Sequence, residues 1–296
     1  MRVRGSRSRG QAQSEITGFV PGNDGVELFY SVEGEGLPLV FCYGLMCSSL
    51  HWTYQIEALS SSYKTIWCDY RGHNRSGRPH PETMTIESLA ADVLAVLDKL
   101  AIERACFLGH SMGVSVVLEI YRQRPDFVSH MVLANGTAQR PLEMLLGPVS
   151  SPLFRFFGAA HKRFPSLVDM VWRIQGQSAL VQAIVGLWGF NTELTSREDI
   201  ARYVEQVASM DPALWLKMLE SYEQYDATYL LERISLPVLL IGGMLDRVMP
   251  KVKQELMHQL LPQSELVLLP HGSHCPQMDM PEQVSHLIRD FLDRHN

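Results

Sequence analysis

Short hydrophobic runs alternate along the chain with longer stretches in which apolar residues recur every three or four positions. Runs of four or five apolar residues have the length of buried strands, whereas the longer spacing is that of one face of an α-helix. Strands that alternate with helices predict βα units, whose parallel strands form one sheet. The predicted strands cover residues 38–42, 65–68, 105–108 and 131–134, and the predicted helices cover 50–59, 86–100 and 112–122.

The two ends of the chain complete this pattern. Turn-forming residues at 22–25 (Gly-Asn-Asp-Gly) separate two β-rich segments within 17–40, which predicts an antiparallel hairpin. Toward the C-terminus we expect strands at 237–241 and 265–269 and helices at 251–261 and 281–292. The chain is therefore predicted to be an α/β protein, with a mostly parallel central sheet of about eight strands flanked by helices.

The alternation breaks after Asn135 and Gly136. About 100 residues with helical periodicity and many large apolar side chains follow, which predicts a helical segment inserted from Gln139 to about Glu232. The predicted parts are a core of residues 16–137 and 233–296, a helical cap at 138–232, and a disordered basic tail at 1–15.

Charge and composition exclude several classes of protein. The 296 residues have a formal net charge of −6, and because residues 1–10 carry four arginines and no acid, the rest of the chain is at −10, which argues against nucleic-acid binding. The longest apolar stretches, such as 179–190, are too short to span a bilayer, and no apolar segment after the basic start resembles a signal peptide. An odd number of cysteines, five, predicts free thiols in a reducing compartment. We expect a cytoplasmic protein with no integral membrane segment.

The candidate nucleophile is Ser111. It stands in the sequence Gly109-His110-Ser111-Met112-Gly113, between an apolar strand and a helical pattern. A serine held at a sharp strand-to-helix turn presents its hydroxyl clear of the sheet, and small neighbours are needed because the turn is strained. The motif is short enough to arise by chance, so its partners must decide its meaning.

A serine nucleophile needs a base, almost always histidine, and a carboxylate that orients the base. Asp246 follows one predicted strand and His274 follows the next, so both are expected at the edge of the sheet where Ser111 lies. Asp69 is an alternative acid, interpreted as a loop anchor, and His271 is an alternative base. The carboxylate could also follow the sixth predicted strand, but the residue at that position is Asn135, which is not an acid.

The order Ser111, Asp246, His274 resembles that of the α/β-hydrolase family, in a member with a serine nucleophile and a helical cap. The segments 242–250, 272–274 and 69–77 are also similar to family motifs, although 69–77 has Asn74 where glycine is common. The resemblance implies that Arg71 and His73 order their loop.

The resemblance also implies an oxyanion hole. Its two backbone N–H donors would belong to Met112 and Leu45. Tyr43 stands where the family usually has histidine, which leaves the bracing of this loop open.

Capped members of the family place part of the insertion over the active site. Its tryptophans, Trp172, Trp188 and Trp215, are therefore candidate substrate contacts, and its many Met, Leu and aromatic residues favour an apolar acyl or aryl group.

These inferences predict a serine hydrolase that cleaves an ester, or a similar acyl bond, of a small to medium apolar substrate through an acyl-enzyme. No metal or organic cofactor is expected, because no step requires one and no C-x-x-C or Cys/His cluster is present in the sequence. The alternatives are a C–C bond hydrolase, a cofactor-free haloperoxidase or perhydrolase, an interfacial lipase, and a non-catalytic receptor for a small ligand. The oligomeric state is open.

Overall fold

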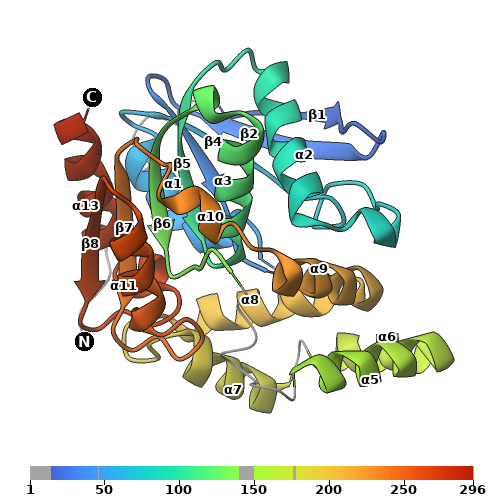
Figure 1. Cartoon of the computed structure of the whole chain (residues 1–296). Helices are drawn as coiled ribbons and strands as arrows, with labels where there is room; N and C mark the ends of the chain where they lie inside the picture. The colour runs from blue at the N-terminus through green and yellow to red at the C-terminus, as the bar shows by residue number, and fades with distance from the viewer. Residues whose placement is uncertain (1–14, 46, 140–149, 176–177, 296) are drawn as a thin grey trace.

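A computed structural model describes residues 15–45, 47–139, 150–175 and 178–295, with residues 150–155 described by their backbone alone. Figure 1 shows one central sheet with helices packed around it and a group of further helices beyond one end of its strands. Among the described residues, no helix combines the length and the apolar character that crossing a membrane requires. The predicted tail lies almost wholly outside the described residues.

The sheet contains eight strands in the order β1-β2-β4-β3-β5-β6-β7-β8. β1 pairs antiparallel with β2, and β2 pairs antiparallel with β4, whereas every later pair is parallel. The predicted α/β fold, with its antiparallel N-terminal hairpin, is confirmed. The strands are β1 (Ile16–Pro21), β2 (Glu27–Glu33), β3 (Pro38–Cys42), β4 (Lys64–Cys68), β5 (Ala105–His110), β6 (Val128–Ala134), β7 (Val238–Gly243) and β8 (Ser264–Leu269).

The order of the strands places the helices in two layers. In the sheet, β4 lies on one side of β3 and β5 lies on the other. Crossover connections between parallel strands are right-handed, so α1, which connects β3 to β4, and α2, which connects β4 to β5, lie on opposite faces of the sheet. α3 and α11 follow the second direction and share the face of α2, whereas α13 packs against α1 on the other face. The bounds are α1 (Thr53–Leu59), α2 (Ile86–Lys99), α3 (Met112–Gln123), α11 (Lys251–Leu260) and α13 (Pro281–His295).

The predicted helix at 50–59 is divided. Ser49–Trp52 forms a 3₁₀ turn, and α1 begins only at Thr53. The Ser48 side chain accepts a hydrogen bond from the Leu50 N–H, and the fully buried Trp52 donates one to the carbonyl oxygen of Cys42 at 3.2 Å. Tertiary burial of this tryptophan fixes the first turn in a tighter geometry than the hydrophobic spacing indicates.

Among the described residues, six helices stand between β6 and β7, most of them beyond the carboxyl end of the sheet (Figure 1). A backbone bridge between Gln139 and Asp226 joins the start of this insertion to its end. α9 packs into the main hydrophobic core through Leu214 and Met218. The helices are α5 (Ser150–Arg163), α6 (Pro165–Gln175), α7 (Ala179–Gly189), α8 (Arg197–Ser209), α9 (Pro212–Gln224) and α10 (Thr228–Leu231).

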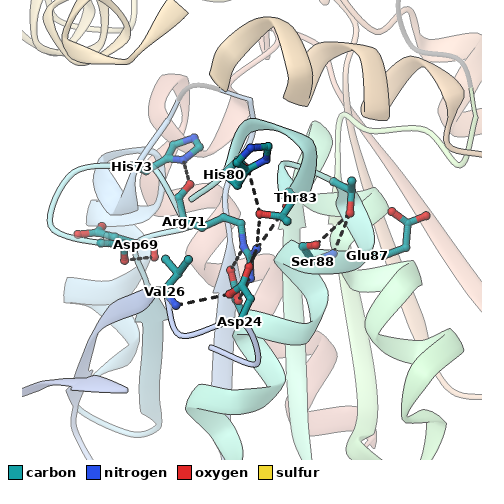
Figure 2. Close-up of polar contacts among 12 residues, drawn as sticks. Asp24, Val26, Asp69, Arg71, His73, His80, Thr83, Glu87 and Ser88 are labelled. Carbon is teal, nitrogen blue, oxygen red and sulfur yellow. Dashed lines mark hydrogen bonds and ion pairs between the residues drawn. The ribbon is translucent and has the colours of Figure 1, made fainter. Parts of the chain in front are cut away.

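Arg71, in the loop after β4, is the centre of a buried polar cluster (Figure 2). Its guanidinium contacts the carboxylates of Asp92 in α2 at 2.6 Å and of Asp24 in the β1–β2 turn at 2.7 Å. It also donates to Thr83, and its own carbonyl oxygen lies 3.0 Å from His73 Nδ1. Arg71 and His73 therefore order their loop, as predicted, and connect it to the hairpin and to α2.

Candidate active site

Ser111 lies in a strained turn between β5 and α3. Its backbone angles, φ 54° and ψ −120°, fall outside the regions that L-residues ordinarily adopt. The turn is also crowded, because a Cβ on Gly113 would lie 2.2 Å from the Cys42 carbonyl oxygen and a Cβ on Gly109 would lie 2.7 Å from the Gly113 carbonyl oxygen. Only glycine fits at these two positions, and the tight turn that results holds Ser111 at the carboxyl end of the sheet.

His274 lies between Ser111 and Asp246. Its Nε2 is 3.1 Å from the Ser111 Oγ, and its Nδ1 is 3.0 Å from the Asp246 Oδ2. The other carboxylate oxygen of Asp246 accepts hydrogen bonds from the N–H groups of Val248 and Met249 at 2.7 and 2.8 Å. A carboxylate fixed in this way favours the His274 tautomer with its proton on Nδ1, which leaves Nε2 able to accept the serine proton.

Asn135 connects the loops that carry Asp246 and His274. It follows β6 with a φ of 41°, a left-handed conformation that asparagine tolerates better than most residues. Its Oδ1 accepts from the Gly243 N–H at 2.9 Å, and its Nδ2 donates to the carbonyl oxygens of Ser273 and His274 at 2.6 and 3.1 Å. The sequence identified Asn135 only as a missing carboxylate. Its only signal was a single asparagine at the end of a buried strand.

His110 supports the main chain of His274. Its Nε2 lies 2.8 Å from the His274 carbonyl oxygen, which can only accept, and its Nδ1 lies 3.2 Å from the Nδ1 of His51. Burial lowers the pKa of His51 to about 3 and holds the pKa of His110 well below its ordinary value, and neighbouring imidazoles lower both further. Both rings are therefore neutral at neutral pH. His110 therefore donates from Nε2 to the His274 carbonyl oxygen and accepts on Nδ1 from His51.

The two N–H groups predicted for an oxyanion hole belong to residues beside Ser111. Met112 is the first residue of α3, so its N–H is one of the first-turn donors that have no partner within the helix. Leu45 follows β3 and lines the same cavity as Ser111. A Cβ on Gly44, its neighbour, would lie 3.1 Å from the Ser111 Cβ. The donor roles remain a prediction.

Tyr43 braces the loop before Leu45 in place of the expected histidine. Its hydroxyl accepts from the Tyr70 N–H at 2.6 Å, the Tyr70 hydroxyl donates to the Tyr43 carbonyl oxygen at 3.3 Å, and the two ring centroids are 4.1 Å apart. This reciprocal pair of tyrosines orders the loop through contacts that a histidine at position 43 would not make.

A cavity of about 310 Å³ opens between the insertion and the core at Ser111. Its walls are mainly apolar and include Trp172 of α6 and Trp188 of α7. Trp215, the third tryptophan predicted as a substrate contact, is not among the described residues that line it. Its ring packs against that of Trp172, with centroids 4.9 Å apart, and so supports the wall from behind.

Asp279, which the sequence gave no reason to single out, joins the insertion to the loop that carries His274. Its Oδ2 accepts from both the N–H and the hydroxyl of Ser273, at 2.7 and 2.6 Å. Its Oδ1 accepts from the Asn191 N–H and the Thr195 hydroxyl, at 2.9 and 2.6 Å. These donors are more than 70 residues apart in the chain, so no local motif could have revealed the carboxylate that they share.

The other sequence candidates have different places. Asp69 accepts from the Arg75 side chain at 2.7 Å and anchors its own loop, as interpreted. His271 is exposed, and its carbonyl oxygen accepts a hydrogen bond from the Asn191 side chain of the insertion at 2.8 Å. All five cysteines lie in the described part of the chain and are free and buried, which confirms the predicted thiols.

A possible metal-ligand group is formed by His51, His110 and Cys275, whose ligand atoms lie within 4.8 Å of one another. Both ring nitrogens of His110 already make hydrogen bonds, and so does the His51 Nδ1. Burial raises the pKa of the Cys275 thiol well above its ordinary value, which disfavours the thiolate that binds metals. These donor atoms therefore fit a metal poorly.

Comparison with known proteins identifies relatives along almost the whole chain. The family model described as alpha/beta hydrolase fold matches residues 38–281. The putative carbamate hydrolase RutD of Stutzerimonas stutzeri (strain A1501) is 27% identical over 268 residues, covering 90% of this chain and 95% of the relative.

Solved structures agree with this match. A thermophilic esterase from Thermogutta terrifontis has a TM-score of 0.75 at 24% identity, covering 95% of this chain and 100% of its own. A bromoperoxidase from Bacillus anthracis has a TM-score of 0.78 at 21% identity, covering 94% and 100%. At these identities the likeness shows the fold alone. Because the family model spans most of the chain, the protein belongs to the α/β-hydrolase fold family.

Proposed function

We propose that this protein is a serine hydrolase that cleaves a carboxylic ester, or a similar acyl bond, of a small to medium apolar substrate through an acyl-enzyme. The observation that carries the proposal is the unbroken line of contacts from the Ser111 Oγ through His274 to Asp246, at 3.1 and 3.0 Å, beside an apolar cavity. This is the arrangement that turns a serine hydroxyl into a nucleophile.

In the first half of the reaction, Ser111 attacks the substrate carbonyl carbon while His274 takes the serine proton on Nε2. Asp246 stabilises the imidazolium that forms, because its Oδ2 already contacts the Nδ1 of that ring. The negative charge on the carbonyl oxygen is met by the N–H groups of Leu45 and Met112. His274 then gives its proton to the leaving group, and the acyl group stays on Ser111.

In the second half, water bound at His274 loses a proton to Nε2 and attacks the acyl carbon. Collapse of this second intermediate releases the acid and returns the proton to Ser111. Residues 138–232 act as the cap in this scheme, and Trp172 and Trp188 hold the apolar part of the substrate. None of the steps needs a metal or an organic cofactor.

A carbamate is the second candidate substrate, because the relative from Stutzerimonas stutzeri is named a putative carbamate hydrolase. A carbamate presents the same kind of carbonyl to Ser111 as an ester does. C–C bond cleavage and perhydrolysis can use the same three side chains, and a receptor of this fold would bind without turnover.

A substrate panel on wild type and Ser111→Ala distinguishes these chemistries. The panel contains p-nitrophenyl esters of graded chain length, aryl carbamates, amides and meta-cleavage-type diketones. We expect ester turnover in wild type and a loss of at least about 1000-fold in kcat/KM for Ser111→Ala. A fluorophosphonate probe should label Ser111 of the wild type, as read by peptide mass spectrometry.

Ser115→Ala is the matched control. The Ser115 hydroxyl donates to the Thr137 carbonyl oxygen at 3.3 Å and is buried in α3, so its loss should leave turnover within about threefold of wild type. Near-full activity of Ser111→Ala would overturn the proposal. Absence of both labelling and turnover in wild type would favour the receptor.

A further inference from the structure

Tyr222, in the cap helix α9, has a buried hydroxyl without a hydrogen-bond partner among the described residues. The side chain is only 3% exposed, and it lines the same cavity as Ser111 and His274. An unsatisfied buried hydroxyl destabilises a folded protein. The Tyr222 hydroxyl is therefore a polar group in the cavity wall that is available to a bound substrate.

The surroundings of the Tyr222 hydroxyl place it beside the nucleophile. Tyr222 and Ser111 line one cavity, and burial raises the pKa of the phenol while an interaction with the Ser111 hydroxyl acts in the opposite direction. At neutral pH the phenol keeps its proton and can donate but cannot act as a base. The cavity is otherwise mainly apolar, so apart from the side chains around Ser111 a bound substrate is the source of an acceptor for this hydroxyl.

Hydrogen bonds on both sides of Tyr222 fix α9 to the core. The hydroxyl of Ser221 accepts from the Ile86 N–H at the start of α2, at 3.1 Å. The Tyr225 hydroxyl donates at 3.2 Å to Glu119 in α3, the helix that follows Ser111. Tyr222 is thus carried by a helix that is tied to the same elements as the nucleophile, so its hydroxyl is held in place before substrate binds.

We propose that the Tyr222 hydroxyl donates a hydrogen bond to a substrate oxygen on the carbon that Ser111 attacks, in addition to the main-chain donors. The inference rests on the proposed function. The attacked carbon bonds directly to the Ser111 Oγ, and its other oxygens are only one further bond away. A donor beside Ser111 therefore reaches the atoms where charge develops in the tetrahedral intermediate.

Tyr222→Phe tests this role because it removes the hydroxyl and keeps the ring. With a p-nitrophenyl ester we expect kcat to fall about 10- to 100-fold while KM changes by less than about threefold, as for a donor that acts mainly in the transition state. The melting temperature should stay equal or rise, because the variant no longer buries an unpartnered hydroxyl. A boronic acid that forms a tetrahedral adduct on Ser111 should bind more weakly by a factor similar to the loss in kcat.

Tyr63→Phe is the matched control. The Tyr63 side chain is also buried, and its hydroxyl donates to Asp293 of α13 at 3.4 Å, on the opposite face of the sheet from α3. This variant should keep wild-type kcat and boronate affinity.

Two results would overturn the role of Tyr222. One is a kcat for Tyr222→Phe within twofold of wild type. The other is a loss of kcat accompanied by a lower melting temperature and unchanged boronate affinity, which would make the residue structural. If Ser111→Ala is inactive in the same experiment, the proposed function stands although the inference fails. If wild type neither turns over the ester nor binds the boronate, both fail.

Discussion

At the scale of single residues, the candidate site depends on side chains that form hydrogen bonds with the main chain of the loops around it. Asn135 illustrates this, since its amide bonds the carbonyl oxygens of Ser273 and His274 and accepts from Gly243. The position of His274 against Ser111 is therefore set partly by a group that never touches the substrate. Such a positioning residue acts through geometry, and a small misplacement of a catalytic group has a large effect on rate.

Asn135→Ala should lower kcat/KM for a p-nitrophenyl ester by about 10- to 100-fold. Asn135→Asp should be at least as damaging, because a carboxylate can accept from the Gly243 N–H but repels the two carbonyl oxygens. Steady-state kinetics, with the free energy of unfolding measured by urea titration, would check both. Equal kcat/KM for wild type and both variants would contradict the role given to Asn135.

The sequence predicts the three side chains of the candidate site but not the residues that hold them. Ser111, Asp246 and His274 each follow a strand and sit in recognisable local patterns. Asn135 is invisible to such patterns, because its partners lie more than 100 residues away. The Tyr222 hydroxyl has no partner among the described residues, so no contact within the chain could have marked it. Asn74 is a lesser case. Its φ of 44° explains why asparagine can replace the glycine that is common at that place.

At the scale of elements, the sheet could be predicted and the arrangement of the insertion could not. The strands were recognisable because buried parallel strands are short, continuous apolar runs. The inserted helices have clear periodicity, but which apolar faces meet the cavity depends on packing between helices, so Trp172 and Trp215 could not be distinguished from sequence. Asp279 shows the same limit for polar contacts, since its partners come from two separate segments.

Asp279→Asn tests whether the insertion and the His274 loop are coupled. The Asp279 carboxylate accepts four hydrogen bonds. In asparagine an NH₂ group replaces one of the two carboxylate oxygens, and this group donates hydrogen bonds but cannot accept them. We expect kcat/KM to fall about tenfold or more and limited proteolysis near Asn191 and Thr195 to become faster than in wild type. Thr195→Val, which removes one of the four bonds, should show the same changes to a smaller degree.

Wild-type kinetics together with a wild-type cleavage pattern in Asp279→Asn would show that the two segments are independent.

At the scale of the whole molecule, stability should depend on two buried neutral histidines. The pKa of His51 is lowered to about 3, and that of His110 lies well below its ordinary value, so neither binds a proton in the folded state at pH 5. Unfolding exposes both rings and returns their pKa to about 6.5. Below pH 6.5 the unfolded chain binds protons that the folded chain does not, so the free energy of unfolding decreases as pH falls.

The expected loss through His51 alone is about 2 kcal/mol between pH 6.5 and pH 5. His51→Gln should therefore reduce the difference in the free energy of unfolding between pH 7 and pH 5 by about that amount, as measured by urea titration at the two pH values. His286 is exposed, and His286→Gln should leave the difference near that of wild type. The same pH dependence in His51→Gln and wild type would mean that His51 binds a proton in the folded state.

The central claim is that the Ser111 hydroxyl becomes covalently acylated during turnover. The most direct measurement is rapid acid quench of the wild type with a p-nitrophenyl ester, followed by peptide mass spectrometry. The account predicts the mass of the acyl group on the peptide that contains Ser111, formed no more slowly than the steady-state rate. Steady turnover without this adduct, or an adduct on another side chain such as that of Cys47, would contradict it.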